Sequence, residues 1–594
     1  MFDYKPPIED IRLAIRLAAL STTQHVGASD SADSVELTDA ILDAAAKIAG
    51  QEFAPLYRHG DIAGVRLQDG IAVVPPDFGK AYRTYVEGGW STLAFESEIG
   101  GQGIPLVVAT AVSEMWSSAN VGMALFLMPI VGAVKLLQKH GDAWQKDVII
   151  PRLVDGSWSV TMSITEPHAG SDLSNLLCKA VPFEAHLYRL FGQKALISIA
   201  DHDMVDNVIH FVLARLPDAP AGTRGLSLFA VPTRLIEADS TLGARNDVRY
   251  TSLENKMGIH VVPTGIVQYG ENEGAVGYLI GKPNCGLECM FTLMSRARVA
   301  IGTLALGNAE RAYQQAVFYS RERRQGSDLT GKKQGTVLLI DHPDVRRMLM
   351  SMKARTEGMR HLCYYTASLI ERSEYASGTE VGGYGSSLSR VELLTPVLKA
   401  YCTEQAFDVV SVAMQIHGGI GYIEESGMPQ LMRDARVHSI YEGATGIQAT
   451  DLVIRKVARD NGACLNALLD EMVATTHAAM SDPQLRLAGQ ILARSLDHIR
   501  EATLFLLGNL AKSPAEVLAS SVPYLNFLAT TVVGWLSIRA ALPGNAQLTS
   551  GTFLRVKKNT ATFFAQHYMA SSSAMLELVR EGAAVSLSVD PDSF

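Results

Sequence analysis

Cysteine is scarce in this sequence, which holds six cysteines in 594 residues and no CxxC pair. Structural zinc sites and disulfide frameworks need cysteines at paired spacings, so the sequence favours neither, and we expect no metal site. Few, scattered cysteines are typical of a reducing compartment. The N-terminal residues also lack the apolar core and cleavage site of a signal peptide. We therefore expect a cytoplasmic protein.

An excess of basic residues is also absent. The formal net charge is −9, whereas nucleic-acid-binding proteins carry clustered positive charge. The charge therefore argues against a nucleic-acid partner, and an anionic ligand would need a local basic patch. With 47% apolar residues, a chain of this length is expected to form several domains and can bury a large cofactor.

Familiar nucleotide and hydrolase motifs are missing. The sequence contains no GxGxxG, GxxxxGK[ST], HExxH or GxSxG motif. These absences argue against a Rossmann NAD site, a P-loop, a zincin and an α/β-hydrolase. A dinucleotide, if bound, must be held in another way.

One long apolar run, Tyr524–Leu542, approaches the pattern of a membrane span because Arg539 is its single charged residue. Polar residues lie inside it, among them Asn526 and Thr530, and Pro523 is a natural first residue of a helix. The sequence favours a buried helix over a membrane span. We expect no membrane contact.

The spacing of apolar residues changes along the chain. From Glu36 to Pro151 it is mostly helical, with helices predicted at 37–48 and 107–115. From Ser159 short alternating or β-branched runs predict an inserted β-domain, with strands at 159–164, 208–213, 226–231 and 265–269. After Gly286 helical spacing returns, with a helix start predicted at 341–344 and a mobile loop at 373–388. A last helical block is expected after Asn461. The fold class is therefore mainly α with an inserted β-domain.

Four short segments are candidates for chemistry, and each also has a structural explanation. The polar segment Thr165–Asp172 follows a predicted strand and suits either a ligand loop or an ordinary turn. Gln415–Tyr422 ends a helix in glycines, as a C-cap does, and Arg321–Gly326 is a basic helix end. Glu442 lies between an aromatic residue and a glycine, followed by small residues that would let a flat ring approach. By composition alone, a single glutamate is more often a surface residue.

Taken together and in this order, the segments TEPHAGSD, ARVAIG, RERRQG, QIHGGIGY and RDARVHSIYEGATGIQ resemble the acyl-CoA dehydrogenase family over roughly Leu93–Lys456. The helical tail and the segments DHDMVDN, KMGIH and DHPDVRRMLM are similar to a longer bacterial branch. That branch includes broad fatty acyl-CoA dehydrogenases and 3-methylmercaptopropionyl-CoA dehydrogenases.

The resemblance implies the family's fold and partners. We expect an N-terminal extension (1–35), an α-helical domain (36–158), a β-domain (159–285), a four-helix domain (286–460) and an additional α-helical domain (461–594). The implied cofactor is FAD, the substrate an acyl-CoA and the electron acceptor an electron-transferring flavoprotein. The implied assembly is a homo-oligomer, either a dimer or a dimer of dimers.

The resemblance also implies roles for particular residues. Those expected beside the flavin are Met162, Ile164, Thr165, Ser171, Leu196, Ile197, Ser198, Ala444, Thr445 and Gly446. Those expected to hold the pyrophosphate and adenosine of an FAD bound mainly to the neighbouring subunit are Arg323, Arg324, Gln325, Gln415, Ile416, His417, Gly418 and Gly419. Those expected on the substrate side are Ser171, Arg298 and Gly443.

Glu442 is the expected catalytic base. A saturated thioester is a weak carbon acid, so its α-proton leaves only toward a desolvated base while the thioester oxygen accepts hydrogen bonds. Some family members place the base one residue before the arginine of the ARVAIG segment, but that position is Ala297 here. The chain departs from the family at Leu196, usually aromatic, and at Ala444, usually threonine. An acyl-CoA oxidase and a non-catalytic flavoprotein of this fold are the alternatives.

Overall fold

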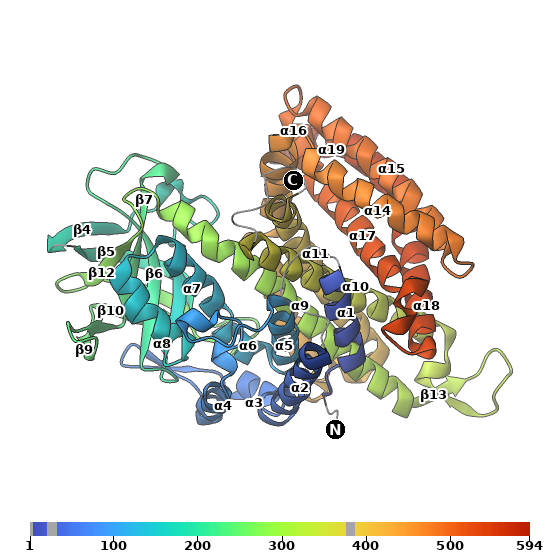
Figure 1. The fold of residues 1–594 in the computed structure, drawn as a ribbon, viewed down its shortest axis with the longest axis horizontal. Helices are drawn as coiled ribbons and strands as arrows, with labels where there is room; N and C mark the ends of the chain where they lie inside the picture. The colour runs from blue at the N-terminus through green and yellow to red at the C-terminus, as the bar shows by residue number, and fades with distance from the viewer. Residues whose placement is uncertain (1–3, 21–31, 185, 376–385) are drawn as a thin grey trace. The chain divides into compact units, whose positions relative to one another are not determined.

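The computed structural model describes residues 4–20, 32–184, 186–375 and 386–594. The chain forms two compact units (Figure 1). The first, called the helical unit below, comprises Met1–Ala46, Leu106–Ser118 and Ile301–Phe594. The second, the β unit, comprises Lys47–Pro105 and Ala119–Ala300. Each unit is thus assembled from separated stretches of the sequence.

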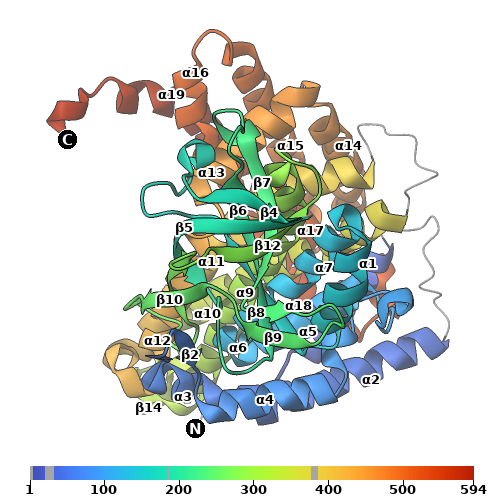
Figure 2. The same ribbon diagram turned by 90° about the vertical axis from the view of Figure 1, so that its left-hand side faces the viewer.

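The β unit is built around an eight-stranded sheet (Figure 2). Its strands are β3 (Trp158–Ser163), β4 (Lys179–Glu184), β5 (Leu187–Ser198), β6 (Asn207–Arg215), β7 (Leu226–Pro232), β10 (Val248–Leu253), β11 (Thr264–Tyr269) and β12 (Ala275–Ile280). Their order is β10-β11-β5-β12-β7-β6-β3, with β4 paired to β5 and β6. Two small pairs complete the strands of this unit, β1 (Arg66–Gln68) with β2 (Ile71–Val73) and β8 (Arg234–Ile236) with β9 (Leu242–Arg245).

Burial explains the sheet. Strands β6 and β7 read as almost continuous apolar runs because nearly every residue in them is buried, as in a strand covered on both faces. β3 pairs with β6 in parallel, whereas β6 and β7 are antiparallel. The four predicted strands correspond to β3, β6, β7 and β11. The helices of this unit are α3 (Leu56–Ala63), α4 (Pro76–Glu87), α6 (Val121–Leu127), α7 (Pro129–His140) and α8 (Ile150–Val154), and α7 and α8 contact β3.

The helical unit contains most of the long helices. They are α1 (Ile8–Leu20), α2 (Ala32–Ile48), α5 (Leu106–Ala119), α9 (Gly286–Glu322), α10 (Pro343–Tyr375) and α11 (Ser387–His417), followed by α12 (Met428–Arg436) and α13 (Thr445–Thr450). Boundaries between the units fall within α2, α5 and α9. A hairpin of β13 (Arg324–Ser327) and β14 (Thr336–Leu338) joins α9 to α10. These elements agree with the predicted helices and helix start, and the predicted fold class is confirmed.

The last part of the helical unit is a group of further helices. They are α14 (Ala463–Ser481), α15 (Arg486–Asn509), α16 (Pro514–Ala519), α17 (Ser521–Ala540), α18 (Gly551–His567) and α19 (Ser572–Leu587). α17 contains most of the apolar run noted above and is buried along nearly its whole length. In the described residues, three helical stretches are long and apolar enough to cross a membrane: Val121–His140, Gly286–Glu322 and Ser521–Ala540. The expected buried helix is therefore present in α17.

The predicted loop at 373–388 is wrong at both ends. Ser373–Tyr375 still belong to α10, and α11 already begins at Ser387. Ser386 caps α11, since its hydroxyl accepts a hydrogen bond from the backbone N–H of Ser389 at 3.3 Å. The Gly/Ser-rich composition of this segment predicts a loop, but one of its serines is the cap of a helix. Residues 376–385 lie outside the described part of the chain.

Candidate active site

Glu442 lies in a turn between α12 and α13 in which two successive residues have left-handed backbones. The φ angle is +54° at Glu442 and +94° at Gly443. A glycine adopts this conformation without steric cost, whereas a residue with a Cβ pays about 1–2 kcal/mol. Such outliers persist only where the surroundings hold them, and they concentrate at functional sites. The side chain of Glu442 is half-buried.

Two buried side chains hold the carbonyl groups of this turn. The Nζ of Lys399, on α11, donates a hydrogen bond to the Gly443 carbonyl oxygen at 2.8 Å. The Nε2 of Gln448, on α13, donates to the same oxygen at 3.2 Å and to the Glu442 carbonyl oxygen at 3.4 Å. Both side chains belong to residues that are 0% exposed. The turn is therefore fixed from inside the helical unit.

A neutral histidine supports the residue before Glu442. The Nε2 of His438 lies 3.2 Å from the Nδ2 of Asn308, and its Nδ1 lies 3.1 Å from the Tyr441 hydroxyl. Burial and, to a lesser extent, the charge of Lys399 together lower the pKa of His438 to about 3. An uncharged His438 accepts the amide hydrogen of Asn308 at Nε2. Burial, with a contribution from the charge of Glu442, raises the pKa of Tyr441.

The glycine-rich end of α11 presents backbone to its surroundings. Gly418 has φ +59°, and a Cβ placed at Gly418 or Gly419 would meet nothing within 4 Å. His417 is fixed below them, with its Nδ1 2.8 Å from the Ala413 carbonyl oxygen and its ring stacked on Tyr319 at 4.4 Å between centroids. Gln415 is exposed, whereas the side chain of Ile416 is buried. This end has room for a ligand beside its backbone.

The basic segment at the end of α9 is exposed. Arg323, Arg324 and Gln325 all lie on the surface at the start of the β13–β14 hairpin. Arg324 donates a hydrogen bond to the Thr336 carbonyl oxygen at 2.9 Å, and His342 contacts the Gln325 carbonyl oxygen at 2.7 Å. The hairpin thus displays positive charge of the kind that suits a phosphate group.

In the β unit, a buried ion pair fixes the polar segment after β3. Lys194, 0% exposed, donates to the Ile164 carbonyl oxygen and to Glu166 Oε1, each at 2.9 Å. Glu166 also accepts the backbone N–H groups of Leu177 and Cys178 at 2.7 and 3.0 Å. Attraction to Lys194 and these N–H groups lower the pKa of Glu166 against the opposing effect of burial. Sequence reasoning missed this pair, because β5 also contains Arg189 and Gln193 and so its lysine does not stand out.

The fixed segment leaves several predicted flavin neighbours accessible. Thr165 is half-buried, with its carbonyl oxygen accepting the N–H of Ala195 at 2.9 Å, and Ser171 is exposed. Met162 and Ile164 are half-buried, as is Ser198, whose hydroxyl lies 2.8 Å from that of Thr264. Ile197 points into the sheet core, so only its backbone can face a ligand.

Leu196 carries a large apolar side chain that is 63% exposed on a left-handed backbone of φ +58°. An exposed leucine beside hydroxyl and backbone donors suits a flat, partly apolar ring system. In the helical unit, Ala444 and Thr445 are half-buried and Gly446 is exposed with open space around it. The side chain of Thr445 donates to Glu404 at 2.5 Å. Within the β unit, the exposed Leu196 and its neighbouring donors therefore fit an isoalloxazine ring.

The two α9 positions of interest belong to the β unit. Ala297 is buried and carries no acid, and Arg298 is half-buried. The base proposed by sequence thus has no competitor at position 297.

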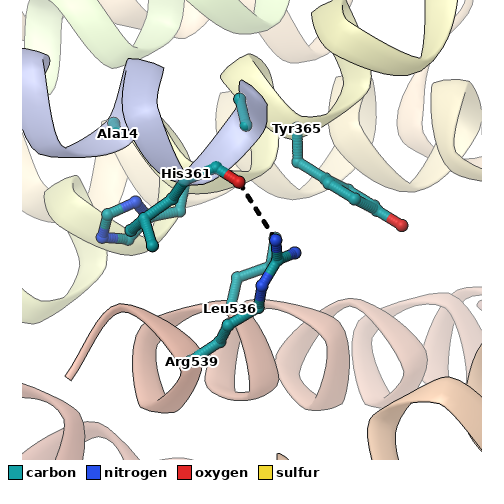
Figure 3. Close-up of a pocket in the computed structure, with 7 residues that line it drawn as sticks. Ala14, His361, Tyr365, Leu536 and Arg539 are labelled. Carbon is teal, nitrogen blue, oxygen red and sulfur yellow. Dashed lines mark hydrogen bonds between the residues drawn. The ribbon is translucent and has the colours of Figure 1, made fainter. Parts of the chain in front are cut away.

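A small cavity lies elsewhere, among α1, α10 and α17 of the helical unit (Figure 3). Arg539 donates a hydrogen bond across it to the Leu17 carbonyl oxygen at 3.0 Å. The space open to a water-sized molecule is about 10 Å³, which is about enough for one water. None of the predicted site residues lines this cavity, and we regard it as a packing gap.

The fold and these residue clusters define an acyl-CoA dehydrogenase, and the chain belongs to that family. The model of the acyl-CoA dehydrogenase N-terminal domain matches residues 36–157, and that of the C-terminal domain matches 284–457. The model described as acetyl-CoA dehydrogenase C-terminal like matches residues 468–590. The predicted family and enzyme class are confirmed, and so is FAD as the cofactor.

Two relatives cover most of the chain. It is 40% identical over 580 residues to a 3-methylmercaptopropionyl-CoA dehydrogenase from Ruegeria pomeroyi, which spans 96% of this chain and 97% of that protein. It is 32% identical over 527 residues to the broad-specificity linear acyl-CoA dehydrogenase FadE5 from Mycobacterium tuberculosis, which spans 85% of each.

Solved structures share the fold at lower identity. Caenorhabditis elegans ACDH-11 in complex with C11-CoA superposes with a TM-score of 0.78 at 20% identity, covering 98% of this chain and 97% of that one. An acyl-CoA dehydrogenase complexed with FAD from Bacillus anthracis gives 0.73 at 19% identity, covering 94% and 89%. These likenesses extend through the additional C-terminal helices.

Proposed function

We propose that this protein catalyses the α,β-dehydrogenation of an acyl-CoA thioester to a trans-2-enoyl-CoA, with Glu442 removing the α-proton. The observation that carries the proposal is the left-handed, internally clamped turn at Glu442 and Gly443. A glutamate held at a conformational cost is better explained by a demand for one carboxylate position than by a surface role. Bound FAD would supply the hydride acceptor for the β-carbon.

The residues of the chain would divide the remaining work. The carboxylate of Glu442 takes the proton, and its backbone N–H donates to the thioester oxygen as negative charge develops there. Gly443, Ser171 and Arg298 would line the substrate side. The flavin would contact the segment fixed by Glu166 and Lys194, with the exposed Arg323–Gln325 and the Gln415–Gly419 end holding the pyrophosphate and adenosine of a second copy's FAD.

The substrate class follows from the relatives rather than from pocket depth. The names of the two relatives point to 3-methylmercaptopropionyl-CoA and to linear acyl-CoA thioesters. We propose an unbranched acyl-CoA of short or medium length, including thioethers, in the β-oxidation type of reaction. We further propose a cytoplasmic homo-oligomer that passes electrons to an electron-transferring flavoprotein.

The first test is anaerobic bleaching of the bound flavin with a panel of short, long, branched and thioether acyl-CoAs. Glu442→Gln is expected to keep the yellow colour and to lose bleaching. Glu424→Gln, an exposed glutamate paired with Arg433, serves as the matched control and should bleach normally. Unchanged bleaching by Glu442→Gln would refute the assignment of the base.

An acyl-CoA oxidase is the second candidate, because oxidases of this fold share the base and the long helical tail. Oxygen consumption and hydrogen peroxide are measured during turnover in air, with and without an artificial electron acceptor. We expect little peroxide. Peroxide formed in equal amount to the enoyl product would favour the oxidase.

A further inference from the structure

Lys399 is fully buried, and its ammonium group donates a hydrogen bond to a backbone carbonyl oxygen of the Glu442 turn. An ammonium group is costly to remove from water unless hydrogen bonds compensate it. An apolar side chain of similar length could fill the same space on α11 at no such cost. A lysine here therefore points to a need for a strong donor at the Gly443 carbonyl oxygen.

The geometry shows what that donor does. Two successive left-handed residues turn the Glu442 and Gly443 carbonyl oxygens inward, toward Gln448 and Lys399. Without these donors the two half-buried carbonyl groups would lose their hydrogen bonds from Lys399 and Gln448, and Glu442 would gain by returning to a negative φ. The direction of a side chain follows its backbone angles. Relaxation of the turn would therefore move the carboxylate.

The other polar groups around the turn do not replace Lys399. His438 is neutral and contacts Asn308 and Tyr441. Glu404 accepts a hydrogen bond from Thr445 and offers no donor. Among the hydrogen bonds described for the Gly443 carbonyl, Lys399 provides the charged one, and a charged donor is roughly twice as strong as a neutral one.

We propose that Lys399 is a positioning residue for proton abstraction, and that it acts with Gln448 to lock Glu442 in its left-handed conformation. The inference rests on the proposed role of Glu442 as the base. Lys399 would touch neither substrate nor flavin, and its effect would reach the reaction through the backbone of residues 442 and 443.

The test follows α-proton removal separately from flavin reduction. The FAD-loaded protein is incubated in D₂O with a 3-thiaacyl-CoA, in which sulfur at the β-position acidifies the α-proton and cannot give up a hydride. Deuterium uptake at the α-carbon is measured by mass spectrometry. Lys399→Met is expected to slow this exchange about a hundred-fold per bound flavin, as misplacement of a reacting group by about 1 Å does. Gln448→Met is expected to slow it less, about ten-fold.

Lys557→Met is the matched control. Lys557 is another buried lysine of the helical unit, but it pairs with Asp10 and Glu357. Its loss should lower the melting temperature and leave exchange per bound flavin unchanged. If Lys557→Met slows exchange as much as Lys399→Met, or if Lys399→Met exchanges at the normal rate, the inference is overturned. If Lys399→Met does not fold, the exchange rate of Gln448→Met tests the inference instead. A normal exchange rate in Gln448→Met would then contradict it.

Glu442→Gln separates this inference from the proposed function. Unchanged exchange in Glu442→Gln overturns the base itself. Lost exchange in Glu442→Gln together with normal exchange in Lys399→Met overturns only the positioning role. A crystal structure of Lys399→Met is expected to show Glu442 at negative φ, and a retained φ near that of the parent would contradict the mechanism.

Discussion

At the scale of single residues, Leu196 is the most informative departure from the family's pattern. It projects an exposed apolar side chain from a left-handed position of β5, where the family usually has an aromatic residue. In the proposed FAD site, the size of this side chain limits how much of the flavin is covered.

Leu196→Trp is therefore expected to tighten FAD binding, because an indole covers more of a flat ring and stacks on it. We expect a roughly ten-fold lower dissociation constant, which corresponds to about 1.4 kcal/mol. Return of FAD fluorescence after dilution measures it. Leu177→Trp, at another exposed leucine of the β unit, should leave the constant unchanged. Equal FAD release from the Leu196→Trp variant and the parent would show that position 196 does not face the flavin.

The sequence predicts Glu442 as the base but does not predict which side chains hold its turn. Two short segments carry recognisable patterns of adjacent residues. One contains Glu442 and Gly443, and the other contains the glycines after His417. Lys399 and Gly443 are 44 residues apart, and nothing local distinguishes a lysine that reaches a distant carbonyl from one that faces water. The Glu166–Lys194 pair was missed for the same reason, since 28 residues separate its partners.

At the scale of secondary structure elements, α5, α9 and α10 are joined by a buried charge cluster. Arg360 donates to Glu114 at 2.6 Å and to Glu310 at 2.7 Å, and Tyr364 donates to Glu114 at 2.6 Å. Arg360 and Glu114 are each 1% exposed. Burial raises the pKa of Glu114 even though Arg360 acts to lower it. One cation thus pairs with carboxylates from two helices.

Arg360→Met is expected to lower the free energy of unfolding by about 3–5 kcal/mol, because it leaves buried carboxylates without a cation. Arg152→Met removes an exposed pair with Asp155 and should cost at most about 1 kcal/mol. Melting temperatures of the two variants measure the difference. Similar losses in both would mean that the buried cluster is not needed for helix packing.

Helices α10 and α17 approach closely at Gly358. A Cβ there would lie 2.4 Å from the Val533 Cγ1 atom. Gly358→Ala gains about 1 kcal/mol of helix propensity but forces an overlap that costs about 1–3 kcal/mol, so we expect a net loss of stability. Gly508→Ala, near the end of α15 with open space around it, should gain stability. The opposite order of melting temperatures would contradict the packing argument.

Element types were the most predictable part of the fold. Runs such as 208–213 and 226–231 predict strands because their buried apolar residues are contiguous, and β6 and β7 confirm them. The predicted loop ends at 373–388 were wrong because serine is common both in loops and at helix caps. Composition therefore cannot tell where a loop stops and the next helix begins. The parallel pairing of β3 with β6 could not be predicted from the sequence. It is set by how all the strands are arranged in the sheet, and neither strand's own residues determine it.

At the scale of the whole molecule, both units bury neutral histidines. Burial lowers the pKa of His202 to about 4 and those of His210, His361 and His438 to about 3. In the unfolded chain the same groups have a pKa of about 6.5. Between these values the unfolded state binds protons that the folded state does not, so the stabilising contribution is complete above about pH 6.5 and is lost as the pH falls.

We expect the melting temperature to fall steeply below pH 6, with each histidine contributing up to about 1.4 kcal/mol per pH unit. Thermal unfolding at pH 7, 6 and 5 at constant ionic strength measures this. His210→Gln should unfold more easily at pH 7 but show a shallower decline on acidification. A decline as steep as that of the parent would show that His210 is protonated in the folded protein.

The division into interleaved units could not be read from apolar spacing, which reports local structure only. It also sets an order of events during synthesis. Asp10 on α1 pairs with Lys557 on α18, 547 residues later. The Leu17 carbonyl oxygen, also on α1, accepts a hydrogen bond from Arg539 on α17. At about 5–20 residues per second, a ribosome needs roughly half a minute to two minutes to make that stretch. Helix α1 packs mainly on α10, which is made well before α17 and α18. The early helix can therefore dock on α10 first, and its packing is completed only when the last helices supply Arg539 and Lys557.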